Sequence, residues 1–112
     1  MLKGINPLLN AEVLHVLRAM GHGDEIALTD ANFPATALGE RCHRLDGLSA
    51  TTVLQAILSV LPLDSFVPDP ALVMQVVDDP DAVPPVVAEF QAIITATAAE
   101  ILPIKIQVLP LN

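Results

Sequence analysis

The sequence predicts an α/β protein, a compact layered fold in which a mostly parallel sheet is flanked by helices. Three observations lead to this prediction. The 112 residues suffice for one hydrophobic core but not for two, so we expect a single domain over residues 1–112. Hydrophobic residues make up 53% of the chain, which argues against disorder. Apolar residues at helical spacing alternate along the chain with short apolar runs that are typical of strands.

Three helices are predicted, each from a recognisable start. Asn10 and Ser49 are good N-cap residues, and Pro84-Pro85 suits the first turn of a helix. Gly21 ends the first helix, and Pro62 ends the second at about Leu61. The faces expected to be buried are Val13, Leu14, Leu17 and Met20 in the first helix, Val53, Leu54, Ile57, Leu58 and Leu61 in the second, and Val86, Val87, Phe90 and Ile94 in the third.

Four short apolar segments between these helices predict strands. Glu25–Thr29 is expected to be a buried strand that ends at Asp30, and residues 41–45 could form a second strand before the Asp46-Gly47 turn. Residues 71–77 are continuously apolar, which favours a strand covered on both faces. Residues 104–109 are expected to form the last strand.

Charge and residue usage exclude several classes of function. Thirteen Asp and Glu against five Lys and Arg give a net charge of −8, which argues against nucleic acid and anionic membranes as partners. No stretch is apolar for long enough to span a membrane, and the N-terminus does not resemble a signal peptide. A single cysteine, Cys42, cannot form an internal disulfide and fits a reducing compartment, so we expect a cytoplasmic protein.

Metal, cofactor and nucleophile signatures are also missing from the sequence. His15, His22, Cys42 and His43 form no recognised ligand pair, so no metal site is predicted. Cys42 and His43 are adjacent and would point to opposite faces of a strand, which argues against a thiol–imidazole pair. The chain has no glycine-rich phosphate loop and no GxSxG motif, and we expect no cofactor.

The residues most suited to chemistry are His22 and Asp24, in a Gly-His-Gly-Asp loop, and Asp30, at the end of a predicted strand. Carboxylates accept hydrogen bonds from sugar hydroxyls, and an imidazole exchanges protons near neutral pH. The alternative is a plain helix C-cap with an exposed histidine, followed by an aspartate that caps a turn. We expect His22 and Asp30 to share a crevice, although a five-residue strand would separate them by roughly 15 Å. Either the strand is shorter, or a neighbouring subunit supplies one of the two residues.

Several motifs resemble the L-fucose mutarotase branch of the fucose mutarotase and ribose pyranase superfamily. They are MLKGI with PLL at residues 1–9, MGHGDEI at 20–26, DANFPA at 30–35, RLDGL at 44–48, LDSF at 63–66 and PPVVAEF at 84–90. The likeness runs from Met1 to about Leu109. It implies a cofactor-free cytoplasmic enzyme that interconverts the anomers of an unphosphorylated sugar and forms homo-oligomers. In that resemblance His22 is the proton donor, Asp30 binds substrate, and Asp24 contacts substrate or orients the loop.

The sequence departs from the family pattern near its C-terminus. The family continues with an Arg-Phe pair, a Tyr-Glu-Arg motif and a Tyr-Gly-Asn motif, whereas this sequence reads PLN at residues 110–112 and contains no tyrosine. We therefore expect a C-terminally shortened domain with weak activity. Two alternatives remain open: a sugar-binding or oligomer-forming homologue with little catalysis, and a D-ribose pyranase.

Overall fold

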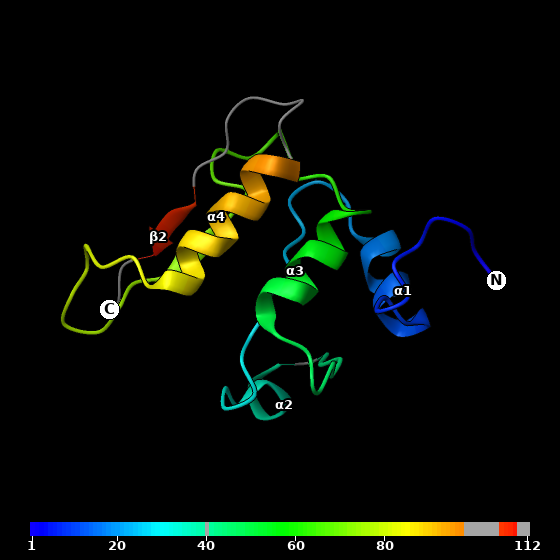
Figure 1. Cartoon of the computed structure of the whole chain (residues 1–112), viewed down its shortest axis with the longest axis horizontal. Coiled ribbons are helices and arrows are strands. Elements are labelled where there is room, and N and C mark those ends of the chain that lie inside the picture. The colour runs from blue at the N-terminus through cyan, green and yellow to red at the C-terminus, as the bar shows by residue number, and fades with distance from the viewer. Residues whose placement is uncertain (40, 98–105, 110–112) are drawn as a thin grey trace. The chain divides into compact units, whose positions relative to one another are not determined.

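The computed structural model describes residues 1–39, 41–97 and 106–109. In chain order the elements are α1 (Ala11–Ala19), α2 (Ala35–Leu38), α3 (Ala50–Leu58), β1 (Leu72–Met74), α4 (Pro85–Thr97) and β2 (Gln107–Leu109) (Figure 1). The chain divides into two compact units, Met1–Leu61 and Pro62–Asn112. The first unit contains α1, α2 and α3, and the second contains β1, α4 and β2.

The predicted helix starts are confirmed. The Asn10 side chain accepts a hydrogen bond from the backbone N–H of Val13 at 2.9 Å, and this interaction caps α1. Ser49 caps α3 in the same way, by accepting from the N–H of Thr52 at 3.3 Å. Such side-chain oxygens satisfy N–H groups that the first helical turn leaves without partners.

The core of the first unit lies between α1 and α3. It is formed by six buried side chains, with partly buried apolar residues packed around them. Ala56 and Ile57 on α3 are the most deeply buried of the six, at 1% and 3% exposure. Four of the six, Val13, Leu17, Val53 and Ile57, were predicted from the amphipathic spacing, whereas Leu9 and Ala56 were not.

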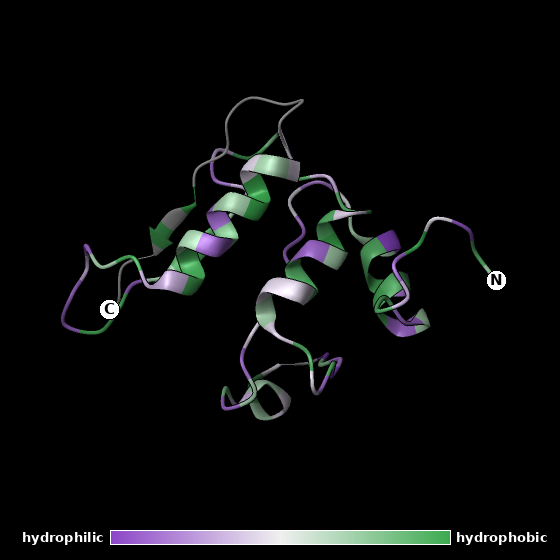
Figure 2. Ribbon diagram, viewed as in Figure 1, coloured by the Kyte–Doolittle hydropathy of each residue, from purple (hydrophilic) through white to green (hydrophobic). Residues whose placement is uncertain are grey.

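The second unit is built on a parallel strand–helix–strand arrangement. β1 pairs in parallel with β2, with Leu72 opposite Gln107 and Met74 opposite Leu109. α4 connects them in sequence and buries Ile94, as predicted, whereas Val86, which was also expected to be buried, is 41% exposed. Figure 2 shows hydrophobic residues along α4 with hydrophilic ones between them. The Gln91 side-chain oxygen accepts a hydrogen bond from the N–H of Ile106 at 2.9 Å, which fastens the start of β2 to this helix. Residues 104 and 105 of the predicted last strand lie outside the described residues.

Two predicted strands are wrong in this structure. Residues 25–29 and 41–45 have no regular secondary structure, and every residue from Gly21 to Pro34 is exposed. Ile26 and Leu28, which were expected to be buried, are each 39% exposed. Their alternation suits a strand, but a strand also requires a hydrogen-bonded neighbour, and the described backbone offers none to this segment.

The remaining differences between prediction and structure concern the lengths of the elements and the burial of their side chains. The strand expected over residues 71–77 is limited to β1, and one of its faces is uncovered, because Leu72 is 43% and Met74 63% exposed while Val73 between them is half-buried. The second helix ends at Leu58 rather than Leu61, although Leu61 still packs against the core. The four-residue helix α2, which follows Pro34, was not predicted.

Candidate functional site

His22 lies in a tight turn directly after α1. The N–H of Asp24 donates to the carbonyl of Gly21 at 3.1 Å, and the N–H of Gly21 donates to Asp24 Oδ2 at 2.8 Å. Gly23 has a φ of +86°, in the left-handed region that side chains disfavour. The turn leaves His22 exposed. The Asp24 carboxylate thus holds the loop closed, in agreement with the loop-orienting role that the resemblance implies for this residue.

Asp30 organises a second turn. Its Oδ1 accepts hydrogen bonds from the N–H groups of Asn32 at 2.7 Å and Phe33 at 3.0 Å. This is the turn-capping use of aspartate that was the alternative to a ligand role. A carboxylate has a second oxygen, and Asp30 is exposed, so turn capping and hydrogen bonding to a ligand are compatible.

The three predicted site residues therefore belong to two turns. His22 and Asp24 share the first turn, Asp30 forms the second, and the irregular segment Glu25–Thr29 joins them. The carboxylate of Asp30 hydrogen-bonds within its own turn rather than to Asp24. A shared crevice for His22 and Asp30 stays a prediction.

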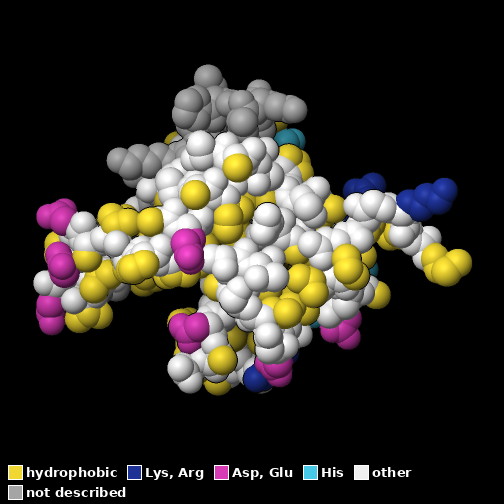
Figure 3. Space-filling model, in the orientation of Figure 1, with side chains coloured by type: hydrophobic (Ala, Val, Ile, Leu, Met, Phe, Trp, Pro, Cys, Tyr) yellow, Lys and Arg dark blue, Asp and Glu magenta, His cyan; other side chains and the backbone are white. Residues whose placement is uncertain are grey.

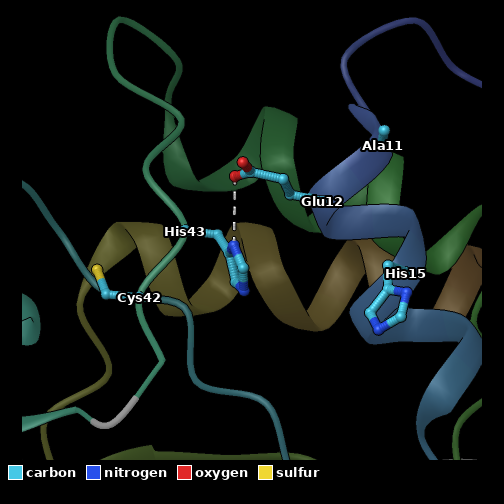
Figure 4. Close-up of a pocket in the computed structure, with 5 residues that line it drawn as sticks. All are labelled: Ala11, Glu12, His15, Cys42 and His43. Atoms are coloured by element: carbon cyan, nitrogen blue, oxygen red, sulfur yellow. Dashed lines mark ion pairs between the residues drawn. The ribbon is translucent and has the colours of Figure 1, made fainter.

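The first unit also has a pocket that the sequence did not predict. It is an open depression of about 540 Å³, lined by Ala11, Glu12 and His15 from α1 and by Cys42 and His43 from the segment before α3. His43 Nδ1 lies 3.5 Å from Glu12 Oε2. Figure 4 shows this pair facing one another, with His15 further along α1 and the Cys42 sulfur directed away from the imidazole. The sequence does not indicate this pocket, because nothing local shows that residues 42–43 fold against α1.

The chemistry of this pocket is that of an imidazole beside a carboxylate. Its side chains do not form a cation cage: within residues 1–39, 41–97 and 106–109, no three His, Cys, Asp or Glu side chains are grouped so that they could hold a metal ion. The Cys42 thiol is exposed and lies 3.7 Å from the hydroxyl of Thr36. The carboxylate and imidazole groups that line the pocket can take part in hydrogen bonds.

Comparison with solved structures identifies the class of the fold. FucU from Bifidobacterium longum matches with a TM-score of 0.84 at 34% identity, covering 96% of this chain and 76% of that chain. Atu2016, described as a candidate sugar binding protein, matches with a TM-score of 0.84 at 41% identity, covering 98% and 75%. The chain thus has the fold of FucU-like proteins.

Sequence comparison identifies the family. Residues 3–109 match the model of the RbsD / FucU transport protein family, and the chain belongs to this family. The fucose mutarotase of Bos taurus is 41% identical over 105 residues, which cover 88% of this chain and 69% of the bovine protein. The fucose mutarotase of Homo sapiens is 49% identical over 79 residues, which cover 68% of this chain. That match spans only 51% of the human protein.

One further observation concerns membranes. Within the part of the chain that the structure describes, no helix combines the length and the apolar character needed to cross a bilayer.

Proposed function

We propose that this protein interconverts the anomers of L-fucose, or of a related unphosphorylated monosaccharide. Family membership and the similarity to fucose mutarotases carry the proposal. Mutarotation breaks the bond between C1 and the ring oxygen, and then re-forms it on the other face of C1. The reaction needs an acid for the ring oxygen and a base for the anomeric hydroxyl, and no cofactor.

His22 is the proposed acid. Its imidazole is exposed on a turn that is braced by the Asp24 carboxylate, so it is accessible to a sugar while its backbone is held. Asp30 is the proposed acceptor for sugar hydroxyls, and Asp24 either adds a hydroxyl contact or keeps the His22 loop in place. General acid–base catalysis of this kind contributes roughly 10²–10⁴-fold, which suits a reaction that already proceeds in water.

We further propose that the protein is a homo-oligomer and that it works in the cytoplasm. Each chain is proposed to contain the layered, mostly parallel sheet. Large apolar side chains on the surface support the oligomer, since Phe66 is 78%, Val77 70% and Val83 65% exposed (Figure 3). Exposed apolar surface of this kind is typical of surfaces that meet a partner. A light-scattering mass equal to one chain at micromolar concentration would contradict the oligomer.

A second candidate function is sugar binding with little catalysis. The description of Atu2016 as a candidate sugar binding protein favours it. D-ribose pyranase activity is the closest enzymatic rival. Binding without anomer exchange would select the first of these alternatives, and faster exchange of D-ribose than of L-fucose would select the second.

Saturation-transfer NMR tests the proposal because it reports exchange between anomers directly. We expect this chain to exchange L-fucose anomers faster than buffer alone, and His22→Ala to remove most of that enhancement while the protein stays folded. Arg18→Ala is the matched control, since Arg18 is an exposed cation in α1, four residues before His22. Equal rates for the wild type and buffer would refute the enzyme, and equal rates for the wild type and His22→Ala would refute the role of His22.

A further inference from the structure

The Glu12–His43 pair places a carboxylate beside one nitrogen of an imidazole. Glu12 Oε2 faces His43 Nδ1 at 3.5 Å. A carboxylate in this position favours a proton on Nδ1, which leaves the Nε2 lone pair to act as a base. The His43 side chain is 32% exposed and that of Glu12 is 76% exposed, so the imidazole is partly enclosed but still accessible to a solute.

The surroundings of this pair suit a small polyhydroxyl compound. The depression of about 540 Å³ is open to solvent, so a monosaccharide can reach the imidazole from outside. Its polar lining comes from Glu12, His15 and His43, which together offer carboxylate and imidazole partners for sugar hydroxyls. The net charge of −8 gives an anionic sugar phosphate no advantage, which favours an unphosphorylated ligand.

We propose that Glu12 and His43 form a second proton-transfer site, which takes the anomeric hydroxyl of a monosaccharide. This inference rests on the proposed mutarotase function and assigns part of that activity to residues outside the Gly-His-Gly-Asp loop. His43 Nε2 accepts the proton of the anomeric hydroxyl as the C1=O1 bond forms and the bond from C1 to the ring oxygen breaks. The same proton then passes from Nε2 through a water molecule to the ring oxygen. Ring closure on the other face of C1 reverses these steps, so protons and electrons balance without an oxidant or a metal.

Glu12 is a positioning residue in this scheme, because it acts on the sugar only through the imidazole of His43. Loss of its charge should weaken catalysis without weakening the fold, since Glu12 is exposed and contributes little to the core. Glu12→Asp keeps the charge on a shorter side chain and should restore part of what Glu12→Gln loses.

The test uses the His22→Ala background, in which only the second site remains. We expect His22→Ala to keep a measurable fraction of the L-fucose anomer exchange above buffer. Adding His43→Gln should reduce the exchange above the buffer rate at least tenfold, so that the total rate approaches that of buffer. A loss of this size lies within the range of general acid–base effects. Adding Glu12→Gln should reduce the same exchange several-fold, with partial rescue by Glu12→Asp. Circular dichroism checks that all variants are folded.

Asp46→Asn in the same background is the matched control. It removes another surface ion pair, Arg44–Asp46 at 3.3 Å, from the segment that also carries His43. Exchange at the same rate in His22→Ala and in His22→Ala with His43→Gln would overturn the second site while leaving the proposed function intact. A wild-type rate equal to that of buffer would instead overturn the mutarotase function, and the second site with it.

Discussion

Replacement of Asn10 by alanine should destabilise the first unit by about 1 kcal/mol. The side chain of Asn10 is exposed, so the substitution removes no core packing. It removes the acceptor 2.9 Å from the N–H of Val13, and that N–H has no intrahelical partner in the first turn of α1. The expected free energy matches both the usual loss of an N-cap and the net contribution of one hydrogen bond.

Urea unfolding followed by far-UV circular dichroism measures this loss. We expect a lower midpoint with an unchanged slope, because the substitution changes the stability and not the surface exposed on unfolding. Asn10→Ser and Asn10→Asp should both stay within a few tenths of a kcal/mol of the wild type, since serine and aspartate are equally good caps. If Asn10→Ser is as unstable as Asn10→Ala, or if Asn10→Ala matches the wild type, the capping argument is refuted.

Three other substitutions or reactions test separate features of the structure. Ile57→Ala should lower the free energy of unfolding in urea by about 3 kcal/mol, and Ile57→Val by about 1 kcal/mol, because Ile57 is 3% exposed between α1 and α3. Equal losses for the two variants would contradict a packed core. Gly23→Ala should lower the free energy of unfolding by about 1 kcal/mol, because the φ of Gly23 is +86°. An added Cβ would meet no atom within 4 Å, so the loss comes from the backbone conformation alone. Gly21→Ala, whose Cβ would make an ordinary 3.8 Å contact, is the control and should cost less. The exposed Cys42 thiol should react fully with a thiol reagent in the native protein; a requirement for denaturant would show that it is covered.

The helices were predictable because their signals are local. An N-cap acts within three residues of itself, as Asn10 and Ser49 do, and the buried faces follow from residue spacing alone. The ends were less predictable, since the stretch after Leu58 continues as a turn even though Leu61 remains packed. Strand prediction for Glu25–Thr29 failed because a strand depends on a neighbour that alternation does not specify.

The candidate site also has a part that the sequence predicts and a part that it does not. The exposure of His22 and the turn-capping of Asp24 and Asp30 follow from short motifs, and the sequence indicated both. The Glu12–His43 pair could not be found in this way, because the two residues are far apart in the sequence and meet only when the chain before α3 folds against α1. The argument that Cys42 and His43 point to opposite faces assumed a strand that does not form at residues 41–45, and it gave no information on what His43 faces.

The geometry of the proposed sugar site depends on the segment between its two turns. Glu25–Thr29 joins the His22 turn to the Asp30 turn, and Ile26 and Leu28 within it are each 39% exposed. Covering such side chains is favourable by about 25 cal/mol for each Å² of apolar surface removed from water. A surface that packs against Ile26 and Leu28 would also fix the path of this segment, because both residues lie between the two turns. Its path in turn sets the separation of the His22 imidazole and the Asp30 carboxylate. In the proposed oligomer, assembly and alignment of the site would therefore be stabilised by the same apolar contacts.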